Sequence, residues 1–144
     1  VCAHAMAEGI ATMPPEPLGA RVRIPDWESG AAVSSDEEIV VEHNWNEVRT
    51  CMWDYVGIVR SNKRLDRAMR RIRNLRQEIR QYYQDYLLTA DILELRSIAA
   101  VGELIVRSAL MRKESRGLHY TLDYPGLLPA VQDTIIADRP GGGV

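Results

Sequence analysis

The stretch SNKRLDRAMRRIRNLRQEIRQYYQDY, residues 61–86, decides the fold of this chain. Its apolar side chains recur at steps of three and four residues, which is the period of one face of an α-helix. Ser61 precedes the run and suits an N-cap, because its hydroxyl can accept a hydrogen bond from a backbone N–H of the first turn. The pattern predicts an amphipathic helix of roughly seven turns. Its apolar stripe consists of Leu65, Met69, Ile72, Leu75, Ile79, Tyr82 or Tyr83, and Tyr86.

One further helix is expected on each side of this one. Before it, Asn44 and Glu47 have the spacing of a capping box, and a helical period follows as far as Val59. After it, Thr89 opens a third helix that continues to about Ser115 and is apolar on most of its circumference. Short connections between long helices favour antiparallel neighbours. The sequence therefore predicts an all-α fold: an antiparallel three-helix bundle with an extended N-terminal linker and a short extended C-terminal segment.

The two ends of the chain differ in composition from the helical part. The first residues suit the end of a helix, with Gly9 near its stop. Pro, Gly and an acidic run follow, which predicts a linker, with a weak strand pattern at residues 39–41. The expected division is a truncated helix at 1–13, an acidic linker at 14–43, a three-helix domain with a docking strand at 44–128, and a flexible tail at 129–144.

A strand-like segment follows the third helix. Gly117 is expected at the position just after the helix end, where a left-handed backbone conformation is common. Apolar and polar residues then alternate up to Pro125 and Gly126. An isolated strand is marginally stable, and no partner strand is expected in this chain, so the segment is expected to lie on the bundle or on another domain. The apolar positions are Leu118, Tyr120, Leu122 and Tyr124.

Composition limits the class of protein. The chain has 144 residues, of which 46% are hydrophobic and 26% charged, as in one ordinary globular domain. It has no apolar run of about 18 residues, which excludes a transmembrane helix, and no secretory signal pattern. Cys2 and Cys51 fit neither a disulfide framework nor a metal motif, which favours a reducing, cytoplasmic setting. Because the chain does not begin with Met, we expect it to be a piece of a longer polypeptide.

The net charge of −2 hides an asymmetry along the chain. Residues 1–44 carry two basic and eight acidic side chains, whereas residues 45–116 carry 15 basic and nine acidic ones. The basic part could contact nucleic-acid phosphates, so a non-enzymatic module that binds nucleic acid or protein is the competing interpretation. No aromatic or amide readout set is interleaved with it, which favours a solvated or inter-domain face. The basic run consists of Arg60, Lys63, Arg64, Arg67, Arg70, Arg71, Arg73, Arg76 and Arg80.

His119 has three charged residues close to it in the sequence, namely Glu114, Arg116 and Asp123. A histidine and carboxylates can perform acid–base catalysis. The sequence has no nucleophile elbow, no metal-ligand spacing and no glycine-rich phosphate loop beside them. Alternation would place His119 and Asp123 on one face, and a hydrogen-bonded structural cluster is favoured over catalysis. The residues themselves predict a helical module with no catalytic, cofactor-binding or metal site.

Three segments carry a family resemblance: RTCMWDYVGIVR at residues 49–60, LELR at 93–96, and MRKESRGLHYTLDYP at 111–125. Together they resemble the C-terminal helical domain of L-aspartate oxidases, and the resemblance runs from the first residue to about Leu128. The core Glu-Ser-Arg-Gly-x-His is shared with flavoprotein subunits of succinate dehydrogenase and fumarate reductase. Those relatives typically have an Arg two residues after the His, where this chain has Thr121. The resemblance therefore favours the aspartate oxidase branch, with the dehydrogenase or reductase branch as a further alternative.

The resemblance implies a function for the whole polypeptide. L-aspartate oxidases use FAD to oxidise L-aspartate to iminoaspartate in NAD biosynthesis, reducing oxygen or fumarate, and quinolinate synthase uses the product. The FAD-binding and catalytic residues would lie in flavin and capping domains that precede residue 1, so none is carried over to this chain and no FAD is expected on the fragment. The domain would dock on those domains, and the fragment could associate with itself. The residues expected to hold the strand-like segment in place are Arg116, His119, Tyr120 and Asp123.

Overall fold

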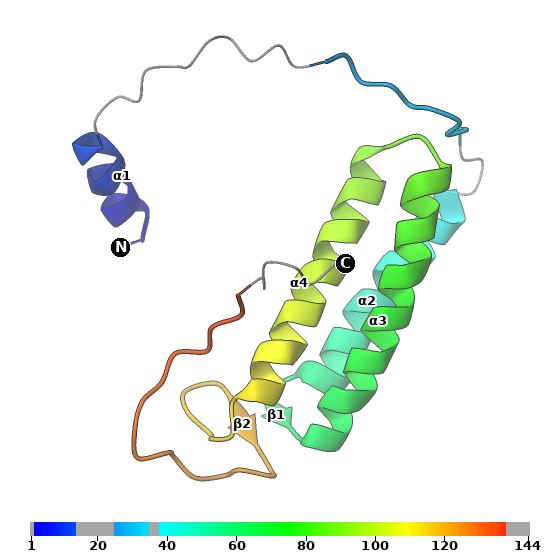
Figure 1. Ribbon diagram of the computed structural model, residues 1–144. Helices are drawn as coiled ribbons and strands as arrows, with labels where there is room; N and C mark the ends of the chain where they lie inside the picture. The colour runs from blue at the N-terminus through cyan, green and yellow to red at the C-terminus, as the bar shows by residue number, and fades with distance from the viewer. Residues whose placement is uncertain (1, 14–24, 35–37, 138–144) are drawn as a thin grey trace.

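The computed structural model describes residues 2–13, 25–34 and 38–137 (Figure 1). These residues form four helices and one pair of very short strands. The expected all-α class is therefore broadly right, although it did not include the strand pair. The elements in chain order are α1 (Cys2–Thr12), α2 (Glu38–Val56), β1 (Val59–Arg60), α3 (Asn62–Asp85), α4 (Ala90–Met111) and β2 (Tyr120–Thr121).

Helix α3 follows the sequence prediction closely. The Ser61 hydroxyl accepts a hydrogen bond from the backbone N–H of Arg64 at 3.3 Å, so Ser61 is the N-cap. The helix continues for 24 residues to Asp85, and Tyr86 is its C-cap rather than its last apolar contact. The buried residues recur at three- and four-residue steps, as expected for one face of a helix. They are Leu65, Ala68, Met69, Ile72, Leu75 and Ile79.

Helix α4 begins as expected and ends earlier than expected. Thr89 is the N-cap and accepts a hydrogen bond from the Ile92 N–H at 3.3 Å. The helix ends at Met111 rather than near Ser115, because the Ser115 backbone N–H donates to the Gly126 carbonyl at 2.9 Å instead of continuing the helix. Gly117 therefore does not end the helix. It has a positive φ of 60°, as expected from glycine, in the turn closed between Arg116 and His119.

Helix α2 begins at Glu38, six residues before the expected cap at Asn44. The weak strand expected at residues 39–41 and the helix start expected at Asn44 are therefore wrong. Val41 and Trp45 pack against the core, so the apolar period extends further back than the capping pattern suggested. The helix ends at Val56, and Val59, expected in the helix, lies in β1. Residues 14–24 and 35–37 of the expected linker lie outside the described residues.

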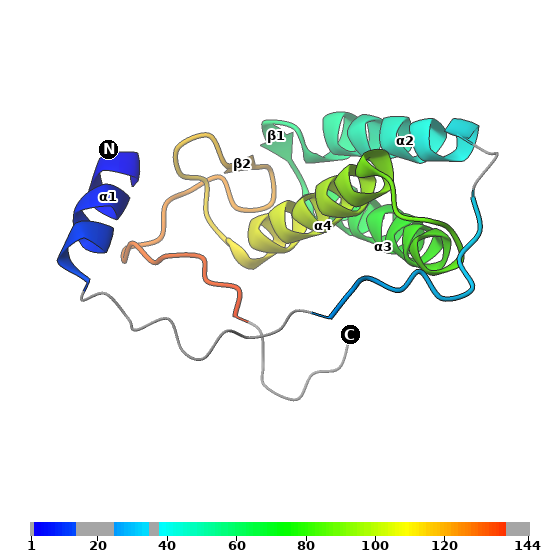
Figure 2. The same ribbon diagram turned by 90° about the horizontal axis from the view of Figure 1, so that it is seen from above.

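Helices α2, α3 and α4 pack side by side around one apolar core (Figures 1 and 2). Ala68 and Ala99 are fully buried, which lets the helix backbones approach closely. Gly102 serves the same purpose on α4, because a Cβ at this position would lie 3.4 Å from the Met52 sulfur. We call these three helices the helical core. Its largest fully buried apolar side chains are Leu65, Ile72, Ile79, Leu95 and Val106.

The two short strands join segments that are far apart in the sequence. Strand β1 pairs in parallel with β2, with Val59 opposite Tyr120 and Arg60 opposite Thr121. The Leu122 N–H donates to the Arg60 carbonyl at 2.9 Å and extends the pairing. The expectation of a strand without a partner in its own chain is therefore wrong. Because the sequence pattern predicts Val59 in a helix, it does not predict that residues 59 and 60 form the partner strand of β2.

The terminal segments contact the helical core to different extents. In residues 25–34, Val33 donates to the Asp85 carbonyl and accepts from the Leu87 N–H, at 3.2 and 2.9 Å, which ties this segment to the end of α3. Helix α1, expected from the composition of the first residues, lies apart from the helical core and exposes Met6 and Ile10 (Figures 1 and 2). Residues 138–144 of the expected tail lie outside the described part. Among the described helices, none has the length and apolar content needed to cross a membrane.

We predict that Ile72→Ala destabilises the chain by about 2–5 kcal/mol, because Ile72 is fully buried at the centre of the core and its loss leaves a cavity. Urea unfolding followed by far-UV circular dichroism measures the change. Arg70→Ala, at an exposed position of the same helix, is the control and should change stability by less than about 0.5 kcal/mol. Equal stability of both variants would contradict the described core.

Candidate functional site

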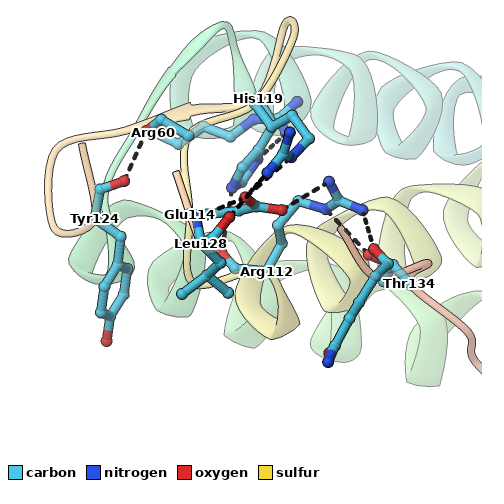
Figure 3. Close-up of polar contacts among 10 residues, drawn as sticks. Arg60, Arg112, Glu114, His119, Tyr124, Leu128 and Thr134 are labelled. Carbon is cyan, nitrogen blue, oxygen red and sulfur yellow. Dashed lines mark hydrogen bonds and ion pairs between the residues drawn. The ribbon is translucent and has the colours of Figure 1, made fainter. Parts of the chain in front are cut away.

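The polar groups that follow α4 form the densest hydrogen-bonded cluster among the described residues (Figure 3). We call it the Glu114 cluster, and it consists of Arg60, Arg112, Glu114, Arg116 and His119. It lies where the loop after α4 meets strand β1, so it links the end of α4 to the connection between α2 and α3, at one end of the helical core.

Glu114 is the acceptor at the centre of this cluster and is only 3% exposed. The Arg116 guanidinium contacts Oε2 through Nη2 at 2.9 Å and Nε at 3.0 Å. The Leu128 backbone N–H donates to the same oxygen at 3.0 Å, and Arg112 Nη1 lies 3.4 Å from Oε1. These donors, above all Arg116 and then Leu128, lower the pKa of Glu114. The carboxylate is therefore ionised at neutral pH, with both oxygens engaged.

His119 is held between two arginines. Its Nδ1 lies 2.8 Å from Arg60 Nη1, and its Nε2 lies 3.3 Å from the Arg112 carbonyl oxygen. A guanidinium only donates and a carbonyl only accepts, so Nδ1 accepts and Nε2 carries the proton. Burial, and then the positive charge of Arg60, lower the pKa of His119. The ring is thus neutral at pH 7, and both nitrogens are used in holding the loop.

The hydrogen bonds of the cluster hold the loop after α4 in a fixed shape. Ser115, which lies in this loop, donates to the Tyr124 carbonyl at 2.8 Å and accepts from the Thr121 N–H at 2.9 Å. Arg112 also bonds the segment beyond, through Thr134 Oγ1 at 3.2 Å and the Gln132 carbonyl at 3.0 Å. Within the described ranges, no group of three or more His, Cys, Asp or Glu residues could hold a metal ion.

The structure brings together two of the four residues expected to form the docking segment. Arg116 and His119 belong to the Glu114 cluster. Asp123 does not share a strand face with His119. Instead its Oδ2 accepts a hydrogen bond from the Asn62 N–H at 2.7 Å, at the first residue of α3. Tyr120 lies in β2 and is 42% exposed. All four thus make contacts within this chain, Tyr120 through its pairing with Val59, and whether any of them contacts another domain stays a prediction.

Sequence reasoning did not connect Arg60 and Arg112 with His119. Arg60 was counted with the basic helix, yet it lies in β1. The pattern that could have predicted the role of Arg112 is the spacing of Arg112, Glu114 and Arg116, since side chains two residues apart share a face in an extended segment. That spacing was overlooked because these residues were assigned to the third helix.

Several arginines of the basic run on α3 contact side chains of the neighbouring helices α2 and α4. Arg76 and Arg73 pair with Glu103 of α4, the latter through Nε at 3.7 Å. The guanidinium groups of Arg67 and Arg71 lie 5.7 and 5.6 Å from the Tyr55 ring centre, within the range of cation–π contacts. These contacts favour a structural role for this face of α3 over phosphate binding.

Comparison with known proteins gives consistent matches. Residues 45–134 match the family described as fumarate reductase flavoprotein C-term. L-aspartate oxidase of Pseudomonas aeruginosa is 56% identical over 113 residues, which are 78% of this chain and 21% of the relative. L-aspartate oxidase of Yersinia pestis is 53% identical over 130 residues, 90% of this chain and 24% of the relative. The chloroplastic L-aspartate oxidase 2-b of Nicotiana tabacum is 45% identical over 84 residues, 55% of this chain and 13% of the relative. The chain thus spans less than a quarter of the length of these relatives.

The neutral His119 makes stability depend on pH. Its pKa is lower in the folded chain than in the unfolded chain, so below about pH 6.5 the unfolded chain binds more protons. We predict that stability present at pH 7 is lost as the pH falls towards 5, and that His119→Gln reduces this slope. Urea unfolding at several pH values measures it.

The matched control is His43→Gln, because His43 is exposed on α2 and should leave the slope as in the wild type. Long-range ¹H–¹⁵N correlation of the imidazole at pH 7 should show the proton on Nε2 of His119. A charged ring at pH 7 would contradict the described geometry.

Asp123 stabilises the start of α3. We predict that Asp123→Ala destabilises the isolated chain by about 1 kcal/mol, because it removes a bond to a free helix N–H and a negative charge near the positive helix end. Thermal unfolding measures the loss. The control is Asp133→Ala, at an exposed position of the tail, which should have no effect. Equal melting temperatures of both variants would argue against the contact with Asn62.

Proposed function

Because the chain belongs to the fumarate reductase flavoprotein C-terminal family, we propose that it is the C-terminal domain of an FAD-dependent L-aspartate oxidase. The observation that carries the proposal is the 56% identity to the Pseudomonas aeruginosa L-aspartate oxidase over 113 residues. The complete enzyme would oxidise L-aspartate to iminoaspartate in the cytoplasm and pass the electrons through FAD to oxygen or fumarate. Quinolinate synthase would use the product.

We infer that the described residues of this chain do not hold FAD. Its pyrophosphate needs backbone or cationic donors, whereas Arg112 and Arg116 are already paired with Glu114, and Arg60 is a single cation that already donates to His119. A cavity of about 470 Å³ is lined in part by the carboxylates of Glu42, Asp91 and Glu94, whose charge opposes a phosphate. In our proposal the flavin is therefore held by another part of the enzyme, and this domain supplies no catalytic residue.

The domain would act by docking on the flavin and capping domains. We infer that the helical core is an antiparallel three-helix bundle, an arrangement supported by its shared apolar core and by the short connections between successive helices. The Glu114 cluster would give the loop after α4 a fixed shape, with Arg116 and His119 as positioning residues. Tyr120, half-exposed in β2, would then contact the neighbouring domain. Asp123 would contribute by fixing the start of α3.

We predict that this chain alone, with FAD and L-aspartate, forms no hydrogen peroxide. A chimera in which it replaces the matching segment of the Pseudomonas aeruginosa relative should retain FAD and produce peroxide with L-aspartate. A coupled peroxidase assay and flavin absorbance measure both properties.

The control is the same relative with the segment deleted, which should lose activity or FAD. Peroxide from the chain alone would contradict the non-catalytic role. A chimera that retains FAD but oxidises succinate instead of L-aspartate would favour the dehydrogenase or reductase branch.

A further inference from the structure

The outward face of α4 is apolar and exposed. Val101 is 53% exposed, Leu104 45% and Ile105 41%. At positions i, i+3 and i+4 these side chains lie on one face of the helix, away from the buried residues Gly102 and Val106. A helix face turned to water is ordinarily polar, so a continuous apolar face marks a surface that contacts another body.

This face borders a hollow of about 310 Å³ at the C-terminal end of α4. Two arginines and His119 line the hollow together with apolar side chains of α4. The hollow therefore combines an apolar wall with a positively charged edge. It is lined by Arg60, Val101, Leu104, Ile105, Ser108, Ala109, Arg112, His119 and Thr134.

Arg60 is the cation at this edge that lacks a counter-charge. Its Nε donates to the Gly57 carbonyl at 2.8 Å and the Val56 carbonyl at 3.3 Å, and its Nη1 donates to His119. All three acceptors are neutral. Arg112 differs, because it lies beside the Glu114 carboxylate. Among the described residues, no carboxylate lies within ion-pair distance of Arg60.

More apolar surface adjoins Arg60. Val59 and Tyr120 are paired across the two strands and are 48% and 42% exposed. Leu122, whose N–H bonds the Arg60 carbonyl, is 58% exposed. A small ligand in the hollow would leave these side chains in water, whereas a protein surface would cover them. The extent of the apolar area therefore favours a macromolecular occupant.

We propose that this face of α4, with Arg60 at its edge, docks against an apolar surface of the flavin-binding part of the same enzyme that presents a carboxylate to Arg60. This inference rests on the proposed function and specifies the surface that performs the docking. Burying the apolar face removes it from water, and the partner's carboxylate supplies the charge that Arg60 lacks. A partly buried arginine next to a carboxylate can form two parallel hydrogen bonds, which fixes the orientation of docking.

The test introduces Leu104→Asp into the chimera described above, loaded with FAD. We expect the temperature of FAD release to fall by several degrees, because a charge at this position opposes burial of the face. The matched control is Gln77→Asp, which adds the same residue at an exposed position of α3 and should leave FAD release unchanged. Both variants should unfold like the wild type in the isolated 144-residue chain, since Leu104 is exposed there.

Arg60→Gln tests the charged edge. It should lower the temperature of FAD release in the chimera by more than it lowers the melting temperature of the isolated chain, because only the chimera contains the partner carboxylate. Equal temperature shifts in the chimera and in the isolated chain would contradict the presence of a partner carboxylate at Arg60.

Two outcomes would overturn the proposed surface. One is that Leu104→Asp and Gln77→Asp have the same effect on the chimera. The other is that the isolated chain forms a dimer in sedimentation, and that Leu104→Asp dissociates this dimer but leaves the chimera unaffected. That result would mean that the face binds a second copy of this chain. A chimera that is inactive with L-aspartate but still loses FAD earlier with Leu104→Asp would contradict the function and support the surface.

Discussion

The arrangement of this chain depends on the carboxylate of Glu114. It lies almost fully buried between Arg116, Arg112 and the Leu128 N–H, so each oxygen is engaged by donors from a different part of the loop. A buried charge is tolerated only when it is paired and hydrogen-bonded, and here the pairing requires the chain to turn back on itself directly after α4. Together with the hydrogen bond from the Ser115 N–H to the Gly126 carbonyl, this pairing shapes the chain after the helix ends at Met111, and residues 120–122 of the loop lie against β1.

The folded loop then connects the end of α4 with the connection between α2 and α3. Strand β2 pairs with β1, which lies between α2 and α3, and Asp123 binds the first N–H of α3. Arg112 reaches further along the chain to the Gln132 carbonyl. Because these contacts are non-local, loosening the Glu114 cluster would release both the strand pair and the start of α3. One buried acceptor, Thr121 Oγ1, has no partner within the described part of the chain, so the loop is not satisfied at every position.

The parts of the fold that the sequence predicts are those with a local cause. The stripe from Leu65 to Ile79 and the hydroxyls of Ser61 and Thr89 define α3 and the start of α4, because periodicity and capping act within a few residues. The start of α2 was misjudged, since Asn44 resembles a cap while packing of Val41 against the core extends the helix. The strand pair and the contact of Arg60 with His119 join residues about 60 apart, and no local pattern encodes such pairings.

Charge explains why the loop and the outer face of α4 belong to one surface. His119 stays neutral because burial, and then the positive charge of Arg60, lower its pKa, so it cannot compensate the charge of Arg60. The Glu114 carboxylate is directed to Arg112 and Arg116 and is equally occupied. The acceptors of the Glu114 cluster are thus paired within the cluster, and Arg60 is left without a counter-charge at the border of the apolar face of α4. A domain that functioned alone would lose stability by keeping such a face in water, whereas a domain docked on a larger body would bury it. The same feature fits our proposal that this chain has its own core and docks on a neighbouring domain.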